Sequence, residues 1–321
     1  MQQTLKRTSL TLLISGALSV GAVNSGWAAQ VPAGVQLAQQ QNIVINNGSE
    51  VASLDPHKVE GVPESNIILN LLEGLVSTDA NGHVVPAAAA SWENQNYQQW
   101  TFHLRPGAVW SDGSPVTAQD FVYSWQRLAD PKIASPYASY LQYTKVENID
   151  DILTGKKPPQ TLGVKALDEQ TLQVTLSEPV PYFISMLSHT SLKPVKRAVV
   201  EKFGDKWTLP ANYVGNGAYR LKEWVVNERI VLERSPSYWN NKQTVINQAT
   251  FLPITSEVSD VNRFRSGEID ITNSAIPPYL YVKMKREMPE QLHVNPYLCT
   301  FYYELNNKQA PFTDARVRTA V

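Results

Sequence analysis

Residues 43–75 constrain the fold most strongly, because a strand end, a fixed turn and a helix start follow one another there. Residues 43–45, Ile-Val-Ile, predict the end of a β-strand, which Asn47-Gly48 interrupts. Pro56 keeps Asp55 out of helical backbone, so residues 53–56 predict a turn. The chain is therefore expected to leave a sheet and turn before any helix begins.

A helix is predicted from Pro63 onward, because a proline at the first helical position sacrifices no hydrogen bond. Leu69, Leu72 and Leu75 form an apolar stripe, and Gly74 lies near the expected end. The stripe predicts that this helix buries one face.

The short segment between the turn and the helix, residues 58–62, is a candidate recognition element. Val62 precedes a proline and is expected to be extended, and Gly61 has no side chain to block close approach. Bare extended backbone of this kind can pair with another extended chain by strand addition. Spacing alone leaves an ordinary surface loop as the alternative.

Residues 1–28 are typical of a secretory signal. Lys6 and Arg7 precede an apolar run, residues 10–23, which serines and glycines interrupt, and Gly26 and Ala28 suit cleavage before Ala29. A retained membrane anchor is the alternative, although the run is short and broken for a membrane span. The segment has no cysteine that could carry a lipid, so we expect a soluble, exported protein.

Composition indicates a globular protein with more than one domain. The chain has 321 residues, of which 43% are hydrophobic and 18% charged, with a net charge of −1. A charge near zero argues against nucleic acid or an anionic membrane surface as a partner. The 8 Trp and 14 Tyr residues suit either a core or a binding cleft.

The sequence offers no enzyme motif and no cofactor motif. It lacks the glycine-rich phosphate loops, the zinc-protease helix motif and the strained serine turn of hydrolases. Asp112 and Asp120 could be mistaken for catalytic carboxylates, but a turn at residues 111–115 and a helix cap at Thr117 explain both. The five histidines show no metal-ligand spacing. We therefore expect a protein that is not an enzyme and binds no cofactor.

Short strands and helices alternate along the rest of the chain. Strands are predicted at residues 100–105, 172–176 and 293–304, with a hairpin of residues 218–224 and 229–234 after a tight turn at 215–217. Helices are predicted after Thr117 with Phe121, Val122, Trp125 and Leu128 inward, after Pro181, and at residues 256–266 with Val258, Val261 and Phe264 inward. A strand is expected to begin at Ile269 and Ile271. The mixture predicts an α/β or α+β protein.

Several motifs resemble those of the bacterial periplasmic oligopeptide-binding proteins, the peptide-capturing subunits of ABC importers (extracytoplasmic solute-binding proteins, family 5). They are SLDPHKVEGVPESN (53–66), PAAAASW (86–92), WTFHLRPGAVWSDGSPVTAQDFVYSWQRLADP (100–131), SPYASYLQY (135–143), LSEPVPYF (176–183), GNGAYRLKEWVVNERIVLERSPSYWNN (215–241), RSGEIDIT (265–272) and PYLCTFYYELNN (296–307). The runs around Glu60, Tyr137 and Cys299 are specific to the oligopeptide binders. The resemblance implies an α/β, periplasmic binding protein-like fold of type II, two-lobed with an extra domain.

The resemblance also implies the binding residues. Glu60, Gly61 and Val62 match the segment that pairs with the main chain of the peptide, and Tyr137 matches a pocket aromatic. Residues that match side-chain pockets near the crossing between lobes are Ser274, Tyr297, Tyr302 and Glu304. Ser274 stands where the family has asparagine, which puts the polarity of that pocket in doubt. Core packing for the tyrosines and a solvated strand face for Glu304 are the alternatives.

The family's layout implies four parts: a signal at residues 1–28, a discontinuous first lobe at 29–72 and 197–298, an additional domain at 73–196, and the start of a second lobe at 299–321. Family members continue further, so we expect a chain truncated at its C-terminal side with most of the second lobe missing. In the family, the cysteine matching Cys299 pairs with one far downstream, so Cys299 is expected to lack its partner.

Two functions compete at this stage. One is a periplasmic solute-binding subunit that captures short peptides and delivers them to the membrane permease of an ABC importer. The other is a truncated remnant with little or no peptide binding. A third keeps the fold and changes the ligand to murein peptide, a nickel chelate or haem, and the contexts of Glu60 and Cys299 favour oligopeptide over these.

Overall fold

The structure is a computed structural model, which describes residues 31, 34–273, 276–295, 300 and 302–321. The chain divides into two compact units, Met1–Ser274 and Ala275–Val321. In the described parts of both units, every helix is too short or too polar to cross a membrane. The predicted signal at residues 1–28 lies outside the described residues.

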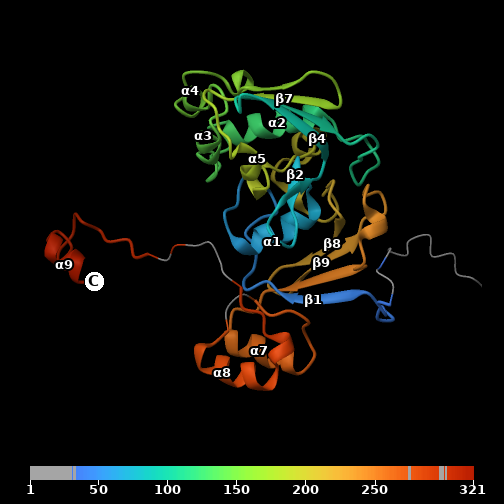
Figure 1. The fold of residues 1–321 in the computed structure, drawn as a ribbon, viewed down its shortest axis with the longest axis vertical. Coiled ribbons are helices and arrows are strands. Elements are labelled where there is room, and N and C mark those ends of the chain that lie inside the picture. The colour runs from blue at the N-terminus through green and yellow to red at the C-terminus, as the bar shows by residue number, and fades with distance from the viewer. Residues whose placement is uncertain (1–30, 32–33, 274–275, 296–299, 301) are drawn as a thin grey trace, which may run out of the picture. The chain divides into compact units, whose positions relative to one another are not determined.

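The first sheet of the larger unit joins strands from distant parts of the sequence (Figure 1). Its order is β1-β10-β9-β8, in which β1 runs parallel to β10 and the other pairs are antiparallel. The strands are β1 (Asn42–Asn46), β8 (Tyr219–Val225), β9 (Arg229–Arg234) and β10 (Gln248–Leu252). The predicted strand at residues 43–45 and the predicted hairpin are confirmed.

The second sheet is antiparallel throughout, in the order β4-β5-β7-β6. Its strands are β4 (Ala89–Gln95), β5 (Gln99–Leu104), β6 (Val164–Ala166) and β7 (Thr171–Thr175). Trp100, Phe102 and Leu104 are buried while His103 between them is exposed, so the predicted alternation of β5 is confirmed. A two-stranded sheet of β2 (Val76–Thr78) and β3 (Val84–Pro86) precedes it.

Helix α2 (Ala118–Ala129) packs on β6 and β7 and begins as the sequence predicts. The Asp120 carboxylate accepts a hydrogen bond from the backbone N–H of Thr117 at 2.8 Å and forms a capping box. The four predicted inner residues are all buried: Phe121, Val122, Trp125 and Leu128. Asp112 accepts from the N–H of Ser114 at 3.1 Å, so a turn and a cap account for both carboxylates.

Helix α1 (Val62–Leu71) lies between the two four-stranded sheets in Figure 1 and packs against β8. Two predictions about it are wrong. Val62 is its first residue rather than extended backbone, and the extended conformation falls on Gly61 instead. Leu72 and Leu75 are buried as predicted, although they follow the end of the helix, but Leu69 is 49% exposed because the helix buries its Ile67, Ile68 and Leu71 side.

The predicted tight turn at residues 215–217 is instead a packing site for the end of α1. A Cβ atom at Gly215 or Gly217 would overlap the backbone of Asn70 and Leu71, and the N–H of Gly217 donates to the Leu71 carbonyl at 2.9 Å. Asn216 between them bonds the N–H and the carbonyl of Glu73, both at 2.9 Å. The glycines therefore permit close approach.

The remaining helices of the larger unit are short: α3 (Tyr140–Thr144), α4 (Ile149–Leu153), α5 (Phe183–Met186), α6 (Arg197–Phe203) and α7 (Glu257–Arg265). The helix predicted after Pro181 is α5. Helix α7 confirms the one predicted at 256–266, with Ser256 as its cap and Val261 buried, but Val258 is 44% exposed and Phe264 only partly buried. Ile271 forms a single bridge to Ile45 rather than the start of a longer strand.

The smaller unit contains α8 (Pro278–Glu287) and α9 (Ala315–Ala320). Asp314 caps α9 by accepting from the N–H of Arg316 at 2.9 Å. The strand predicted at 293–304 is not found: residues 293–295, 300 and 302–304, which are the described part of that range, are irregular.

Candidate functional site

The segment Glu60–Gly61–Val62 is presented at the surface in front of α1. Gly61 is extended, with φ −82° and ψ 153°, and the side chains of Glu60 and Val62 are exposed. The backbone N–H groups of Glu60 and Gly61 bond to no other described residue. The segment therefore offers unpaired backbone donors to an incoming extended chain.

Contacts behind the segment hold its shape. The buried Glu64 accepts a hydrogen bond from the N–H of Ala52 at 2.8 Å, and a Cβ at Gly61 would clash with its carboxylate. Asn47 donates to the carbonyl of Pro63 at 3.1 Å. These bonds join the segment to the loop after β1, so glycine at 61 is required by its surroundings.

Tyr137 contacts this segment directly, although it is far away in the sequence. Its hydroxyl donates to the Glu60 carbonyl oxygen at 3.4 Å. Its ring centroid lies 4.5 Å from that of His189, and the Tyr140 ring stacks on His189 at 4.2 Å. We call Tyr137, Tyr140 and His189 the aromatic cluster. The structure thus brings two of the predicted binding residues together.

Burial sets the ionisation of the aromatic cluster. It raises the pKa of Tyr140, and, together with the charge of Lys193, it lowers the pKa of His189. The N–H of Ser191 donates to Nδ1 of His189 at 3.2 Å, which leaves the proton of the neutral ring on Nε2. The cluster is therefore an uncharged aromatic wall next to the segment.

An ion cluster fixes the turn that precedes the segment. Arg127 forms a bidentate pair with Asp55, at 3.0 and 2.6 Å, and Trp207 Nε1 donates to the same carboxylate at 3.2 Å. Burial raises the pKa of Asp55, but Arg127 and His57 outweigh it, and the net shift is downward. Burial and then Arg127 lower the pKa of His57 to about 3, so this ring is neutral. The motif predicted to be a simple turn is thus a buried electrostatic anchor.

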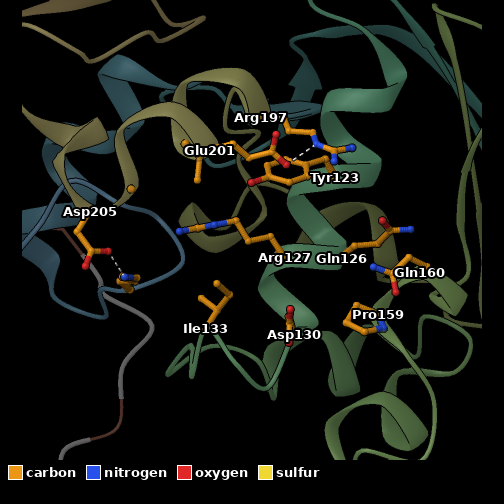
Figure 2. A pocket seen from close by; sticks show the side chains of 13 residues that line it. Tyr123, Gln126, Arg127, Asp130, Ile133, Pro159, Gln160, Arg197, Glu201 and Asp205 are labelled. Atoms are coloured by element: carbon orange, nitrogen blue, oxygen red, sulfur yellow. Dashed lines mark hydrogen bonds and ion pairs between the residues drawn. The ribbon is translucent and has the colours of Figure 1, made fainter.

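A cavity of about 570 Å³ lies on the other side of Arg127 (Figure 2). Arg197 pairs with Glu201 at 2.7 Å and lies over the Tyr123 ring, while Lys58 pairs with Asp205 at 2.6 Å. The cations that line this cavity are already paired with carboxylates of the protein. A charged ligand would therefore gain little by binding there.

The other predicted site residues are distributed as follows. Tyr302 and Glu304 belong to the smaller unit, where both are exposed. Ser274, Tyr297 and Cys299 lie outside the described residues. Among the described residues, no group of three or more acidic, histidine or cysteine side chains could hold a metal ion.

Sequence reasoning missed Tyr140 and His189. A histidine and a tyrosine 49 positions apart (189 minus 140) carry no spacing signal, and only the path of the chain stacks them. It also missed the partners of Asp55, because Arg127 and Trp207 lie on later elements. The SLDPH motif, residues 53–57, is the sequence signal for this cluster, but its local pattern predicts only a turn.

The model of the bacterial extracellular solute-binding proteins, family 5, matches residues 83–321. The chain belongs to this family. Among curated relatives, it is 64% identical to the periplasmic oligopeptide-binding protein OppA of Salmonella typhimurium over 98% of this chain and 58% of that protein. It is 63% identical to OppA of Escherichia coli, over 100% of this chain and 59% of that protein.

Solved structures of family 5 agree with the fold. The structure is similar to Haemophilus influenzae OppA in complex with the peptide RPPGFSPFR, with a TM-score of 0.86 and 53% identity, over 89% of this chain and 56% of that chain. The Escherichia coli murein tripeptide-binding protein MppA gives a TM-score of 0.86 at 44% identity, also over 89% and 56%. The predicted family and fold class are confirmed, and the chain spans little more than half the length of these relatives.

Proposed function

We propose that this family 5 chain forms one side of a peptide-binding site, and that its function is to capture short peptides in the periplasm for the permease of an ABC importer. The observation that carries the proposal is the hydrogen bond from Tyr137 to the Glu60 carbonyl, next to the unpaired N–H groups of Glu60 and Gly61. The named relatives support it, since OppA and MppA are described as peptide-binding proteins.

Recognition through the backbone explains how such a site can accept many sequences. An extended peptide that pairs with Glu60 and Gly61 forms the same main-chain bonds whatever its side chains are. The aromatic cluster, whose three side chains are partly exposed, gives one side chain of the peptide an aromatic surface to contact. The proposal involves no catalytic step and no cofactor.

The proposal also includes the remaining predicted binding residues. Ser274, Tyr297, Tyr302 and Glu304 would line side-chain pockets where the chain crosses between lobes. The first lobe would comprise residues 29–72 and 197–298, with 73–196 as an additional domain and 299–321 as the start of the second lobe. The composition of the sheets supports this division, since the first sheet takes strands from 42–46 and 219–252 and the second only from 89–175.

The second candidate is a fragment of such a protein that binds peptide weakly or not at all, with Cys299 unpaired. The observation that favours it is the share of the relatives that is covered, 58% and 59% of the two OppA proteins.

The test is calorimetric titration of a Lys-containing tripeptide into a version of the chain extended by a family-like second lobe. Tyr137→Ala should weaken binding by about tenfold or more, because it removes an aromatic contact and the bond that positions Glu60. Tyr143→Ala is the matched control, since that tyrosine is 65% exposed on α3 and belongs to neither the Glu60 segment nor the aromatic cluster. Equal affinities for all three proteins would refute the assignment of Tyr137 and the Glu60 segment.

A further inference from the structure

A second cavity, of about 460 Å³, lies in the larger unit between the end of α1, strand β2 and the segment just before β8. Its lining is mixed, and its polar members include Asn70, Glu73, Ser77, Ser188, Lys193 and Tyr238. None of these residues belongs to the Glu60 segment or to the aromatic cluster. The volume suits a small molecule, and junctions between packed elements are common places for ligand sites.

Lys193 brings an ammonium group into this cavity without a protein partner. The residue is only 3% exposed, and no described residue forms a hydrogen bond or ion pair with its Nζ atom. Its stem lies against Gly74, where a Cβ would come within 3.1 Å of Nζ. Its three donors are therefore available to water or to a ligand that enters the cavity.

Lys193 remains charged at neutral pH. Burial lowers its pKa to about 8, against the opposing influence of Glu73. The titratable groups near it are Glu73, which also interacts with Arg105, and His57 and His189, whose rings are neutral. The cavity therefore presents a desolvated positive charge.

Glu73 supplies the opposite charge on the same cavity. Its carboxylate accepts from the Tyr238 hydroxyl at 2.5 Å and from Trp239 Nε1 at 2.8 Å, and Asn216 holds its backbone. Two bonds leave acceptor capacity on a carboxylate, which has about four lone-pair sites. Glu73 and Lys193 form no direct ion pair in the described structure, so the two charges are held apart.

We propose that this cavity binds a small zwitterion of amino-acid size, whose carboxylate contacts Lys193 and whose ammonium contacts Glu73. A simple anion would meet the charge of Glu73, and a simple cation would meet that of Lys193. A zwitterion satisfies both groups, and Ser77, Ser188 and Asn70 offer further hydrogen bonds. The site is separate from the proposed peptide site and does not depend on it.

The test uses the 321-residue protein, titrated with glycine, L-alanine and L-serine and followed by calorimetry and by NMR chemical shifts. We expect saturable binding with a Kd on the order of 1 mM or tighter for at least one of them. Acetate and methylamine, which each carry half of the zwitterion, should bind at least about tenfold more weakly. Absence of saturable binding, or equal binding of the halves, overturns the proposal.

Variants locate the binding. Lys193→Met and Glu73→Gln should each weaken it by about tenfold or more. Lys196→Met is the matched control, because Lys196 is paired with Asp112 away from the cavity and should leave binding unchanged. Binding that survives Lys193→Met but is lost in Tyr137→Ala would place the amino acid at the Glu60 segment and refute the second site. Circular dichroism of each variant verifies the fold.

Discussion

At the scale of single residues, several ionisable groups of the larger unit are buried next to residues that bond to them. Asp55, with side-chain exposure of 3%, is bonded by Arg127, Trp207 and the N–H of His57. Partners of this kind keep a charge inside a protein, where an unpaired charge would be strongly unfavourable. The protonation of these groups therefore links stability to pH.

His57 should make the protein less stable in mild acid. Its pKa is lowered from 6.5 to about 3, so the unfolded chain binds a proton in this range that the folded protein does not. Stability from this group is complete above pH 6.5 and is lost as pH falls toward 3, by up to about 1.4 kcal/mol per pH unit.

Urea unfolding measured across this range, in wild type and in His57→Gln, is the test. The variant should show a flatter dependence of unfolding free energy on pH. His83→Gln is the control, because the His83 side chain is 76% exposed and should not change the slope. Identical slopes for His57→Gln and wild type would show that His57 does not titrate as described.

Lys193 should act in the opposite sense, as a destabilising residue. Its pKa falls from 10.5 to about 8, so below pH 8 the folded protein holds a charge that its surroundings disfavour. Replacement by Met should raise the unfolding free energy at neutral pH by at most about 3 kcal/mol, because the buried Glu73 then loses the positive charge that offsets its own. The gain should shrink as pH rises from 8 to 10.5, where wild-type Lys193 loses its proton on folding. Urea unfolding at several pH values checks this, and a variant less stable than wild type at neutral pH contradicts it.

At the scale of elements, the sequence predicts what depends on local pattern. The alternation of β5 and the capping box of α2 are confirmed because both are encoded within a few residues. The spacing of Leu69 and Val258 predicts that both are buried, but both are exposed. Periodicity predicts which residues share a helix face, and it does not show whether another element covers that face.

Only part of the candidate site can be predicted from local sequence patterns. The Glu60 segment is marked by glycine and proline, whereas His189 and Arg127 become part of their clusters only through tertiary contacts. The Gly215-Asn216-Gly217 motif predicts a turn. Its close packing on the backbone of α1 cannot be predicted from the sequence of that one segment.

Gly217→Ala should therefore destabilise the junction between α1 and β8. The added Cβ would overlap backbone atoms of Asn70 and Leu71, which cannot rotate away as a side chain could. The expected loss is about 1–3 kcal/mol of unfolding free energy. Denaturant unfolding measures it, and a variant as stable as wild type would show that the backbones can separate freely.

At the scale of the whole molecule, the residues that carry the proposed peptide site, Glu60 and Tyr137, both belong to the larger unit. The chain also spans only 58% and 59% of the OppA relatives. Enclosure of a ligand removes it from water and strengthens every polar contact, so an incomplete enclosure weakens binding.

We therefore expect the 321-residue chain to bind a Lys-containing tripeptide at least about a hundredfold more weakly than a version extended by a family-like second lobe. The reason is that a second lobe adds hydrogen bonds to the charged groups of the ligand, and each such bond contributes about 1.5–3 kcal/mol. Parallel calorimetric titrations compare the two proteins. Micromolar or tighter binding by the short chain as a monomer would show that its own residues suffice.

The parallel pairing of β1 with β10 has a consequence for how the chain folds during synthesis. Asn42 pairs with Gln248, so the first strand has no partner until more than two hundred later residues have been made. A contact of such long sequence separation forms late, and an unpaired strand edge is prone to associate with other chains in the meantime. The second sheet takes its strands only from residues 89–175, so it can form first. A nascent chain would thus contain the folded second sheet while its strand β1 is still unpaired.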